Sequence, residues 1–418
     1  MATALSAQTA RDARSYRKSH PWIDFQAPID KLGHRFWMHM GSAESKCLHI
    51  TRSPLKPDLA RQLHQTAVTK GARATTAIEG NTLTEEQVAQ AVRGELEVPP
   101  SQEYLEKEVE NVIRLFNRLT KDLIDEEQPL KLTPEFLDDL NRELLVGTEL
   151  RDGVVPGEIR DYSVTVGGVY RGAPAQDCPY LVECLCDWIN GRELRPTGAD
   201  ADDPATKFSA AFLRATLAHL YMAWIHPYGD GNGRLSRLIE FAILIEAGVP
   251  LTAAHLLSHH YNQTRTRYYA RLDESSRSLD GSGVAGFIAY SAQGFVDQLV
   301  EQLVEISRAV FATTWREYVY DTLPADTVAK RRQRKVALAL PMDTADVADW
   351  PRRVDIRRMT PKLAELYFDK GPRTVARDIN ALAKRGVVVC AGDRAAANSS
   401  LLIRHMPSAR DSDHTTIV

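Results

Sequence analysis

The sequence predicts a mainly α-helical protein: a helical core that carries one β-hairpin, followed by a smaller helix-turn-helix region near the C-terminus. Apolar residues recur at every third or fourth position over most of residues 57–310, which is the period of amphipathic helices. Strand patterns are confined to a short segment near residues 162–170 and to the C-terminal region.

Length and composition agree with a globular chain of this kind. A length of 418 residues is too great for one small module and predicts two or three domains. Hydrophobic residues make up 44% of the chain and charged residues 26%, which excludes a fibrous or globally disordered protein. The net charge of -3 gives no reason for the whole surface to bind a polyanion, so any nucleic-acid site has to be local.

Neither disulfides nor membrane segments are expected. The 5 cysteines are irregularly spaced, and Cys184-X-Cys186 lacks the second pair of a zinc site. No segment has the roughly 20 apolar residues that span a bilayer, and residues 1–18 contain no apolar block of a secretory signal. An ordinary soluble N-terminus is favoured over an arginine-rich transit peptide. We therefore expect a cytoplasmic protein without membrane contact.

Helix signals follow one another along the chain. Thr84 and Gln87 have the pattern of a capping box, Gly94 is a suitable stop, and Thr133-Pro134 is typical of an N-cap followed by a first-turn proline. The expected helical segments are 57–94, 103–120, 133–144, 180–188, 205–225, 235–247, 268–272 and 286–310.

One segment changes to the period of a strand. Tyr162, Val164 and Val166 alternate with polar residues before a pair of glycines at 167–168, and Val169 follows. Two glycines tolerate the positive φ angles of a tight hairpin turn, so a short β-hairpin is expected here.

The composition becomes basic from Pro324 onward. Between residues 330 and 405 there are 17 Lys and Arg against 8 Asp and Glu. A short helix from Thr360 to Gly371, a second helix ended by Gly386, and strands at 387–389 and 401–403 predict a winged helix-turn-helix domain.

The second of these helices has an apolar face formed by Val375, Ile379 and Leu382. The other face carries the residues that a recognition helix would present to DNA: Arg373, Thr374, Arg377, Asn380 and Lys384. Winged helices also pack on other domains or dimerise, so a protein contact or a homodimer is favoured over DNA as the role of this domain, and DNA stays open.

Residues 226–237, HPYGDGNGRLSR, bring together reactive and anion-binding residues that are not clustered elsewhere in the sequence. Glycines let the chain turn before a second helix that is expected from near Asn232, and the free N–H groups of a helix N-terminus bind anions. His226 is a candidate base, Asp230 is an oxygen ligand suited to Mg²⁺, and Arg234 and Arg237 can grip phosphate oxygens. This set indicates phosphoryl or nucleotidyl transfer.

Other phosphate-binding motifs do not fit the segment. A P-loop requires Gly-Lys-Ser/Thr, which is absent, and a dinucleotide fingerprint follows a strand, whereas a helix is expected before this loop.

The segment resembles the signature of the Fic family, His-Pro-Phe-X-Asp/Glu-Gly-Asn-Gly-Arg-X-X-Arg, and differs from it only in Tyr228, which replaces the phenylalanine. A tyrosine suits this position when its ring packs under the loop and its hydroxyl finds a partner. The resemblance extends from Thr75 to about Leu272. It implies a Fic/Fido helical core that transfers AMP from ATP to a Tyr, Thr or Ser hydroxyl of a protein.

The resemblance also implies a role for each matching residue. His226 removes the proton of the target hydroxyl, and Asp230 holds the Mg²⁺ that bridges the phosphates. The other matching residues bind ATP: Gly231, Asn232 and Gly233 at the α-phosphate, Arg234 and Arg237 at the β- and γ-phosphates, and Asn262 in the segment beyond the core.

Residues 75–81, TTAIEGN, resemble the inhibitory motif of the same family, with Thr75, Glu79 and Gly80 at its defining positions. A Glu79 carboxylate against Arg237 would occupy the arginine that the ATP γ-phosphate needs. An intramolecular carboxylate competes at an effective concentration on the order of mM. In some relatives the corresponding glutamate also positions water to remove AMP, so the balance of the two reactions stays open.

Residues 156–160 together with the hairpin resemble the family's flap. Val164, Val166 and Val169 are expected to align an extended target segment through strand addition. A structural cap is the alternative role for this hairpin.

These observations define the expected organisation of the chain. Residues 1–100 form an N-terminal helical region with the inhibitory motif, 101–322 the catalytic core, 323–405 the winged helix and 406–418 a flexible tail. The expected activity is auto-inhibited AMP transfer to a target protein and to the chain itself. The alternative is a DNA-binding transcriptional regulator whose Fic-like domain senses nucleotide without catalysis.

Overall fold

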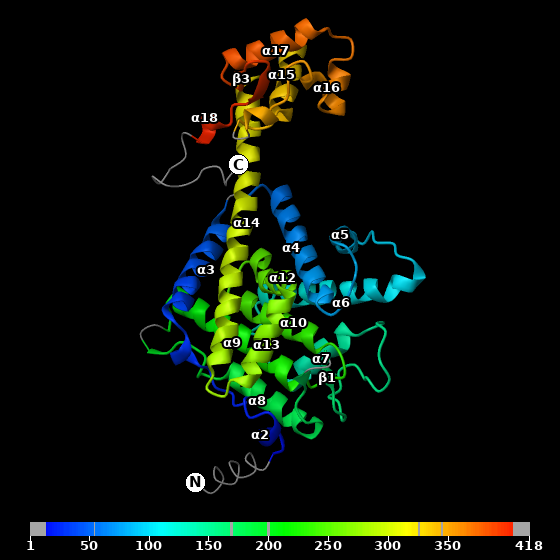
Figure 1. The fold of residues 1–418 in the computed structure, drawn as a ribbon, viewed down its shortest axis with the longest axis vertical. Helices are drawn as coiled ribbons and strands as arrows, with labels where there is room; N and C mark the ends of the chain where they lie inside the picture. Colours follow the sequence, from blue (N-terminus) through cyan, green and yellow to red (C-terminus); the bar gives the residue numbers. More distant parts are fainter. Residues whose placement is uncertain are drawn as a thin grey trace. The chain divides into compact units, whose positions relative to one another are not determined.

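The chain divides into two compact units, between Gln302 and Leu303. The computed structural model describes residues 14–53, 55–167, 170–198, 201–324, 327–343 and 346–403. The division falls inside the long helix α14 (Ser282–Thr322), earlier than residue 323, where the sequence predicts the last domain to begin (Figure 1). As predicted, the fold is mainly helical.

The first unit is built almost entirely from helices. In chain order they are α2 (Tyr16–Ser19), α3 (His34–Arg52), α4 (Pro57–Ala77), α5 (Glu85–Arg93), α6 (Glu103–Thr120), α7 (Pro134–Leu144), α8 (Cys178–Asn190), α9 (Pro204–Ile225), α10 (Asn232–Glu246), α11 (Leu251–Ala254), α12 (Leu256–Gln263) and α13 (Arg265–Arg277).

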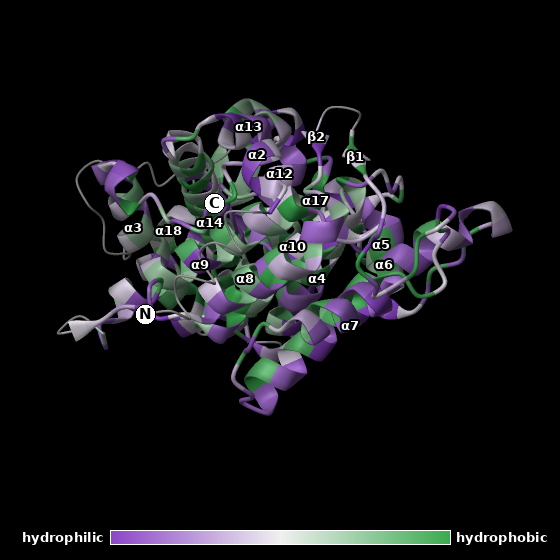
Figure 2. Ribbon diagram, turned by 90° about the horizontal axis from the view of Figure 1, so that it is seen from below, coloured by the Kyte–Doolittle hydropathy of each residue, from purple (hydrophilic) through white to green (hydrophobic). Residues whose placement is uncertain are grey.

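Helices α9 and α10 form the centre of this unit. Most residues of both helices are buried, which explains why these two segments have the strongest apolar patterns of the sequence. Other helices carry hydrophilic and hydrophobic residues in alternation along their length, as one-sided burial requires (Figure 2). Arg234, Arg237 and Glu240 of α10 are buried together with the helix, so they need partners of opposite charge.

The predicted helix ends are confirmed where capping residues mark them. The side chains and backbones of Thr84 and Gln87 form a reciprocal capping box, and Gly94 ends α5 in the left-handed conformation. The Thr133 side chain accepts a hydrogen bond from the Phe136 N–H at the start of α7. The helical pattern of residues 57–94 is interrupted between α4 and α5, and the inhibitory motif lies at that break.

The predicted hairpin is present but very short. Strand β1 (Thr165–Val166) pairs antiparallel with β2 (Tyr170–Arg171), and Thr165 lies opposite Arg171. Val164 extends the pairing, because its carbonyl accepts the Gly172 N–H at 3.2 Å. Val169 lies outside the described residues.

The described part of the second unit consists of helices and one hairpin around a separate apolar core. Its elements after α14 are α15 (Val328–Ala339), α16 (Pro361–Leu366), α17 (Pro372–Lys384), β3 (Val388–Ala391), β4 (Arg394–Ala397) and the one-turn helix α18 (Ser400–Ile403). Val375, Ile379 and Leu382 of α17 face this core, as predicted.

One strand of this unit was predicted at the wrong place. Residues 401–403 belong to α18, and the partner of β3 is β4, so Val388 lies opposite Ala397. A tight turn through Gly392, in the left-handed conformation, pairs the two adjacent segments. The side chain of Asp343 then accepts hydrogen bonds from the Ser399 hydroxyl and the Ser400 N–H, which favours a helical turn after β4.

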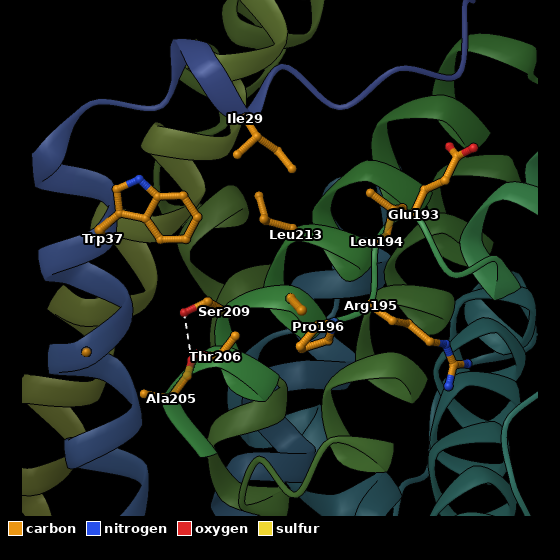
Figure 3. A pocket seen from close by; sticks show the side chains of 12 residues that line it. Ile29, Trp37, Glu193, Leu194, Arg195, Pro196, Ala205, Thr206, Ser209 and Leu213 are labelled. Carbon is orange, nitrogen blue, oxygen red and sulfur yellow. Dashed lines mark hydrogen bonds between the residues drawn. The ribbon is translucent and has the colours of Figure 1, made fainter. Parts of the chain in front are cut away.

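A pocket of about 320 Å³ lies between α3 and α9 (Figure 3). Trp37 and Ile29 lie on one side of it, and Leu213 and Pro196 line the other. None of its lining residues belongs to the site predicted from the sequence. Among the described helices, none has the length and apolar character needed to cross a bilayer.

Replacing Asp378 with alanine should destabilise the second unit. The Asp378 carboxylate is 1% exposed and accepts hydrogen bonds from Arg332, Gln333 and Tyr367. Its loss leaves the buried Arg332 guanidinium uncompensated, which costs about 3–5 kcal/mol. Urea denaturation followed by tryptophan fluorescence measures this loss. Asp369→Ala, which removes an exposed carboxylate paired with Lys370, is the control and should change stability by less than about 1 kcal/mol.

Candidate active site

The loop between α9 and α10 is shaped by two residues with positive φ. His226 ends α9 with φ 50° and ψ 57°, and Gly231 precedes α10 with φ 80°. The left-handed region is uncommon for a residue with a side chain, so the backbone at His226 is held there by its surroundings. As predicted, the second helix begins at Asn232.

The Asn232 side chain closes this loop from within. Its Oδ1 accepts the Tyr228 N–H at 3.0 Å, and its Nδ2 donates to the Tyr228 carbonyl at 2.8 Å. Both ends of the amide are therefore used by the loop backbone, and Asn232 itself is buried. In this structure the side chain shapes the loop, and the Gly231 N–H donates to Asp230 Oδ1 at 2.5 Å, so a carboxylate already lies at the N-terminus of α10, where helix N–H groups favour negative charge.

Tyr228, the residue that departs from the Fic signature, is buried under the loop. Its hydroxyl donates a 2.7 Å hydrogen bond to Asp138 Oδ1 of α7. The polar partner that a tyrosine requires at this position is therefore present. Burial raises the pKa of Asp138, and the hydrogen bond from Tyr228 offsets part of this effect.

Asn141, one turn further along α7, holds the loop and the flap segment together. Its Nδ2 donates to the Asp230 carbonyl at 2.9 Å, and its Oδ1 accepts the Gly157 N–H at 2.9 Å. A Cβ on Gly231 would lie 3.0 Å from Asn141 Nδ2, so the close approach of α7 also favours glycine at that position.

Arg160 connects the segment before the hairpin to the loop between α9 and α10. Its backbone N–H donates to the Pro227 carbonyl at 2.9 Å, and its Nε donates to the His226 carbonyl at 2.8 Å. Its Nη2 donates to the Ala173 carbonyl at 2.6 Å. The guanidinium thus joins the His226 carbonyl to the Ala173 carbonyl, which lies just after the hairpin, and this fixes the position of His226 relative to the hairpin segment.

The His226 imidazole is neutral at physiological pH. Burial lowers its pKa to about 4, although its Nδ1 contact of 3.3 Å with the Ala223 carbonyl and the negative charge of Glu79 act in the opposite direction. A neutral imidazole can accept a proton, so His226 is in the protonation state that a general base requires.

Arg234 lies between two carboxylates. Its Nη2 contacts Asp230 Oδ1 at 3.0 Å, and its Nη1 contacts Glu108 Oε1 of α6 at 3.2 Å. The Arg234 side chain is buried, whereas Asp230 is partly exposed. Arg234 thereby holds the Asp230 carboxylate beside the N-terminus of α10.

Arg237 makes the interaction that links this site to the inhibitory motif. Its Nη2 contacts Glu79 Oε1 at 2.6 Å and donates to the Thr75 carbonyl at 2.9 Å. The Arg237 side chain is only 1% exposed, whereas that of Glu79 is 35% exposed. The structure therefore brings Thr75, Glu79 and Arg237 together, as the resemblance implies.

The Glu79 carboxylate also lies against the start of α10. A Cβ placed on Gly233 would clash with Glu79 Oε1, so the carboxylate contacts the helix backbone at its second residue. Burial by itself raises the pKa of Glu79, but the positive charges of Arg237 and Arg234 outweigh it, and the net pKa is lowered. An anionic group thus occupies the N-terminal end of α10, where helix N–H groups favour negative charge.

The turn after Glu79 is held by two neighbouring residues. Gly80 has φ 106°, which a residue with a side chain rarely adopts, and the Asn81 Nδ2 donates to Glu108 Oε2 at 2.9 Å. Since Glu108 also contacts Arg234, the inhibitory motif and the catalytic loop share this carboxylate.

Asn262 lies on α12 near the same segment. Its Oδ1 accepts a hydrogen bond from Arg265 Nη2, which also donates to the Ala77 carbonyl. Tyr269 of α13 donates to the Ile78 carbonyl at 3.2 Å. The segment beyond the core therefore contacts the two residues that precede Glu79.

The structure also fits a magnesium ion held mainly by phosphate oxygens. Among the described residues no group of three or more His, Cys, Asp and Glu side chains could form a complete metal site. Asp230 offers one partly exposed carboxylate, and Mg²⁺ in nucleotide sites is commonly bound through one or two carboxylates together with substrate phosphates.

Three supporting residues were not singled out from the sequence: Glu108, Asp138 and Asn141. Asn141 had a detectable signal, because it lies in the buried stripe of α7 with Leu137, Leu140 and Leu144, where a polar residue is unexpected. Glu108 and Asp138 had none, since acidic residues are ordinary on the outer faces of helices.

Comparison with known proteins agrees with this geometry. Residues 131–244, which include the hairpin and the catalytic loop, match the sequence model of the Fic/DOC family. Protein adenylyltransferase fic-1 of Caenorhabditis briggsae is 27% identical over 239 residues, which cover 55% of this chain and 43% of that protein. Protein adenylyltransferase Fic of Drosophila willistoni is 28% identical over 195 residues, covering 46% of this chain and 34% of that protein. The chain thus spans less than half the length of these curated relatives.

A solved structure shows the same fold over most of the chain. The crystal structure of a Fic family protein from Desulfovibrio desulfuricans G20 has a TM-score of 0.51 and covers 87% of this chain and 95% of that one. The sequence identity of the two chains is 18%, so this likeness concerns the fold alone.

We expect the His226 imidazole to titrate well below its ordinary pKa of 6.5. Its folded-state pKa is about 4 because burial disfavours the charged form. In a ¹³C-edited NMR titration, the histidine Cε1–H signal that disappears in His226→Ala should remain in its neutral position down to about pH 5. A midpoint near 6.5 would show that the imidazole is solvated, contrary to the structure.

The contact between Tyr228 and Asp138 should contribute measurably to stability. Tyr228→Phe leaves the partly buried Asp138 without its hydroxyl donor, and a double-mutant cycle with Asp138→Ala should give a coupling energy of about 1–2 kcal/mol in urea denaturation. A coupling energy within experimental error of zero contradicts a direct hydrogen bond.

Proposed function

We propose that this chain is an auto-inhibited protein adenylyltransferase, which moves AMP from ATP to a Tyr, Thr or Ser hydroxyl of a target protein and of itself. The observation that carries the proposal is the position of Glu79. Its carboxylate contacts both Gly233 and Arg237, so an internal anion occupies the place where the resemblance puts ATP phosphates. The named activity of the similar proteins supports the same reaction.

In the proposed reaction, His226 removes the proton of the target hydroxyl. The hydroxyl oxygen forms a bond to the α-phosphorus of ATP, the bond from this phosphorus to the bridging oxygen of the β-phosphate breaks, and pyrophosphate leaves. The N–H groups of Gly231 and Gly233 and the Arg237 guanidinium bind the phosphate oxygens, and Asn232 keeps the loop in shape. Asp230 is the residue that would hold Mg²⁺, and the ion would supply positive charge that neutralises the phosphates.

Auto-inhibition follows from competition for Arg237. A buried guanidinium requires an anionic partner, and Glu79 supplies one until a phosphate replaces it. The negative charge of Glu79 acts on His226 in the direction that raises the pKa of its imidazole. This electrostatic link supports a second proposed reaction, in which Glu79 orients a water molecule and AMP is removed from the target.

Each region of the chain has a part in the proposed function. Residues 1–100 act as the inhibitory region, residues 101–322 as the catalytic core, and Asn262 contributes to ATP binding. The edge of β1, beside Val164 and Val166, aligns an extended segment of the target protein by strand addition. The proposed location of the reaction is the cytoplasm. Residues 323–405 form the winged helix domain, whose elements are in the expected order once β4 replaces residues 401–403.

Replacing Glu79 with glycine should raise self-modification. Loss of the internal competitor frees Arg237 for phosphate, so AMP incorporation should rise at least about tenfold. Intact-protein mass spectrometry after incubation with ATP and Mg²⁺ measures the mass gain of one or more AMP groups.

Two matched variants make this test specific. Glu97→Gly, the same substitution in an exposed loop, should remain at the wild-type level. Adding His226→Ala to Glu79→Gly should lower incorporation about 10²–10⁴-fold, since the general base is lost. ATP binding by Glu79→Gly without any incorporation into itself or into lysate proteins contradicts the transferase and favours a non-catalytic nucleotide sensor.

A further inference from the structure

Helix α17 of the second unit presents an exposed row of DNA-compatible side chains. Arg373, Arg377, Asn380 and Lys384 are all exposed and follow one another at intervals of four, three and four residues, which places them along one side of the helix. The opposite side packs into the apolar core through Val375, Ile379 and Leu382. The row is therefore carried by a helix that the core holds in place.

A second basic segment, Arg352 and Arg353, contacts this row. Arg353 donates a hydrogen bond to the Asn380 side chain, and its backbone N–H donates to the Asp393 carbonyl at 2.7 Å. Arg352 contacts the Asp393 carboxylate at 3.0 Å in the turn between β3 and β4. The outer face of α17, residues 352–353 and the tip of the hairpin are thus joined by these contacts into one surface, here called the α17 face.

The acidic residue of α17 is withdrawn from this surface. Asp378 is 1% exposed and faces inward, where Arg332 pairs with it. Residues 330–405 contain 17 Lys and Arg against 8 Asp and Glu, although the whole chain has a net charge of -3. Positive charge is therefore concentrated in this part of the chain, which is the electrostatic pattern of a local polyanion site.

We propose that the α17 face binds double-stranded DNA, with α17 in the major groove. The groove is about 12 Å wide and admits an α-helix. Arg373 and Arg377 lie in the N-terminal half of α17, the part of a recognition helix that contacts base edges. Lys384 and residues 352–353 then contact phosphates on either side of the groove.

The nature of the surface favours DNA over double-stranded RNA. A-form RNA has a deep, narrow major groove that a helix cannot enter, so the row along α17 would reach only one backbone of an RNA duplex. The proposal does not depend on the proposed transferase activity, because none of its residues belongs to the site around His226.

The test uses the full-length chain and a fluorescein-labelled DNA duplex of about two helical turns. Fluorescence anisotropy should show binding that weakens on the order of 100-fold between about 50 and 200 mM salt, as expected for roughly four phosphate contacts. The triple variant Arg373→Ala/Arg377→Ala/Lys384→Ala should weaken binding at least about tenfold and make the salt dependence shallower. His226→Ala should bind as the wild type does.

A matched control distinguishes loss of this surface from a mere change in net charge. Arg35, Arg61 and Arg151 are exposed residues of the first unit, and their triple replacement by alanine changes the net charge equally. This control should bind DNA like the wild type, and an RNA duplex of the same sequence should bind at least about tenfold more weakly than DNA.

Two results would overturn the proposal. The first is equal DNA binding by the α17 triple variant and the control. The second is absence of DNA binding by the wild type. Phe368 is 92% exposed in the turn before α17, so a change in molar mass, measured by light scattering, on replacing it with alanine would then make this region a contact between copies of the chain.

Discussion

The ion pair between Glu79 and Arg237 is the constraint on which the arrangement of the site depends. Arg237 is buried inside the first turns of α10, and a buried guanidinium without an anionic partner is strongly destabilising. Its two oxygen partners come from the end of α4 and the turn that follows: the Thr75 carbonyl and the Glu79 carboxylate. Whatever displaces Glu79 has to supply another anion, and a nucleotide phosphate meets that requirement. The proposed inhibition and the proposed substrate binding are thus two ways to satisfy the same buried charge.

The loop between α9 and α10 is held mainly by side chains that bind its backbone. Asn232 holds the Tyr228 peptide, Asn141 holds the Asp230 carbonyl, and Arg160 holds the His226 carbonyl. Every residue has a backbone carbonyl whatever its side chain, so contacts with these carbonyls do not use the side chains of the loop. Those side chains remain available for chemistry. It also explains how His226 keeps an uncommon left-handed conformation, since contacts from the flap segment and α7 restrain the loop on which it lies.

The two units differ in how their functional positive charges are exposed to solvent. At the candidate site of the first unit, the side chains of Arg234 and Arg237 are buried and paired with carboxylates, as the contacts of Arg234 with Asp230 and Glu108 illustrate. In the second, the two arginines and the lysine of α17 are exposed, and the acidic residue of that helix is buried. Buried pairs suit a site that exchanges one anion for another, whereas an exposed row suits a polyanion that approaches from solvent. The proposed transferase and DNA-binding activities can therefore be separated by mutation.

The sequence by itself determined the local features of this protein: the amphipathic helices, the cap at Thr84, the start of α10 at Asn232, and the His226 loop with its chemical groups. These features depend on residues within a turn or two of one another, so periodicity and spacing reveal them. Only the tertiary structure decided which distant groups meet. It paired Tyr228 with Asp138, made Glu108 a shared partner of Arg234 and Asn81, and chose residues 394–397 over 401–403 as the partner of β3. Such pairings depend on how whole helices and strands pack against one another, and no local pattern of residues records that.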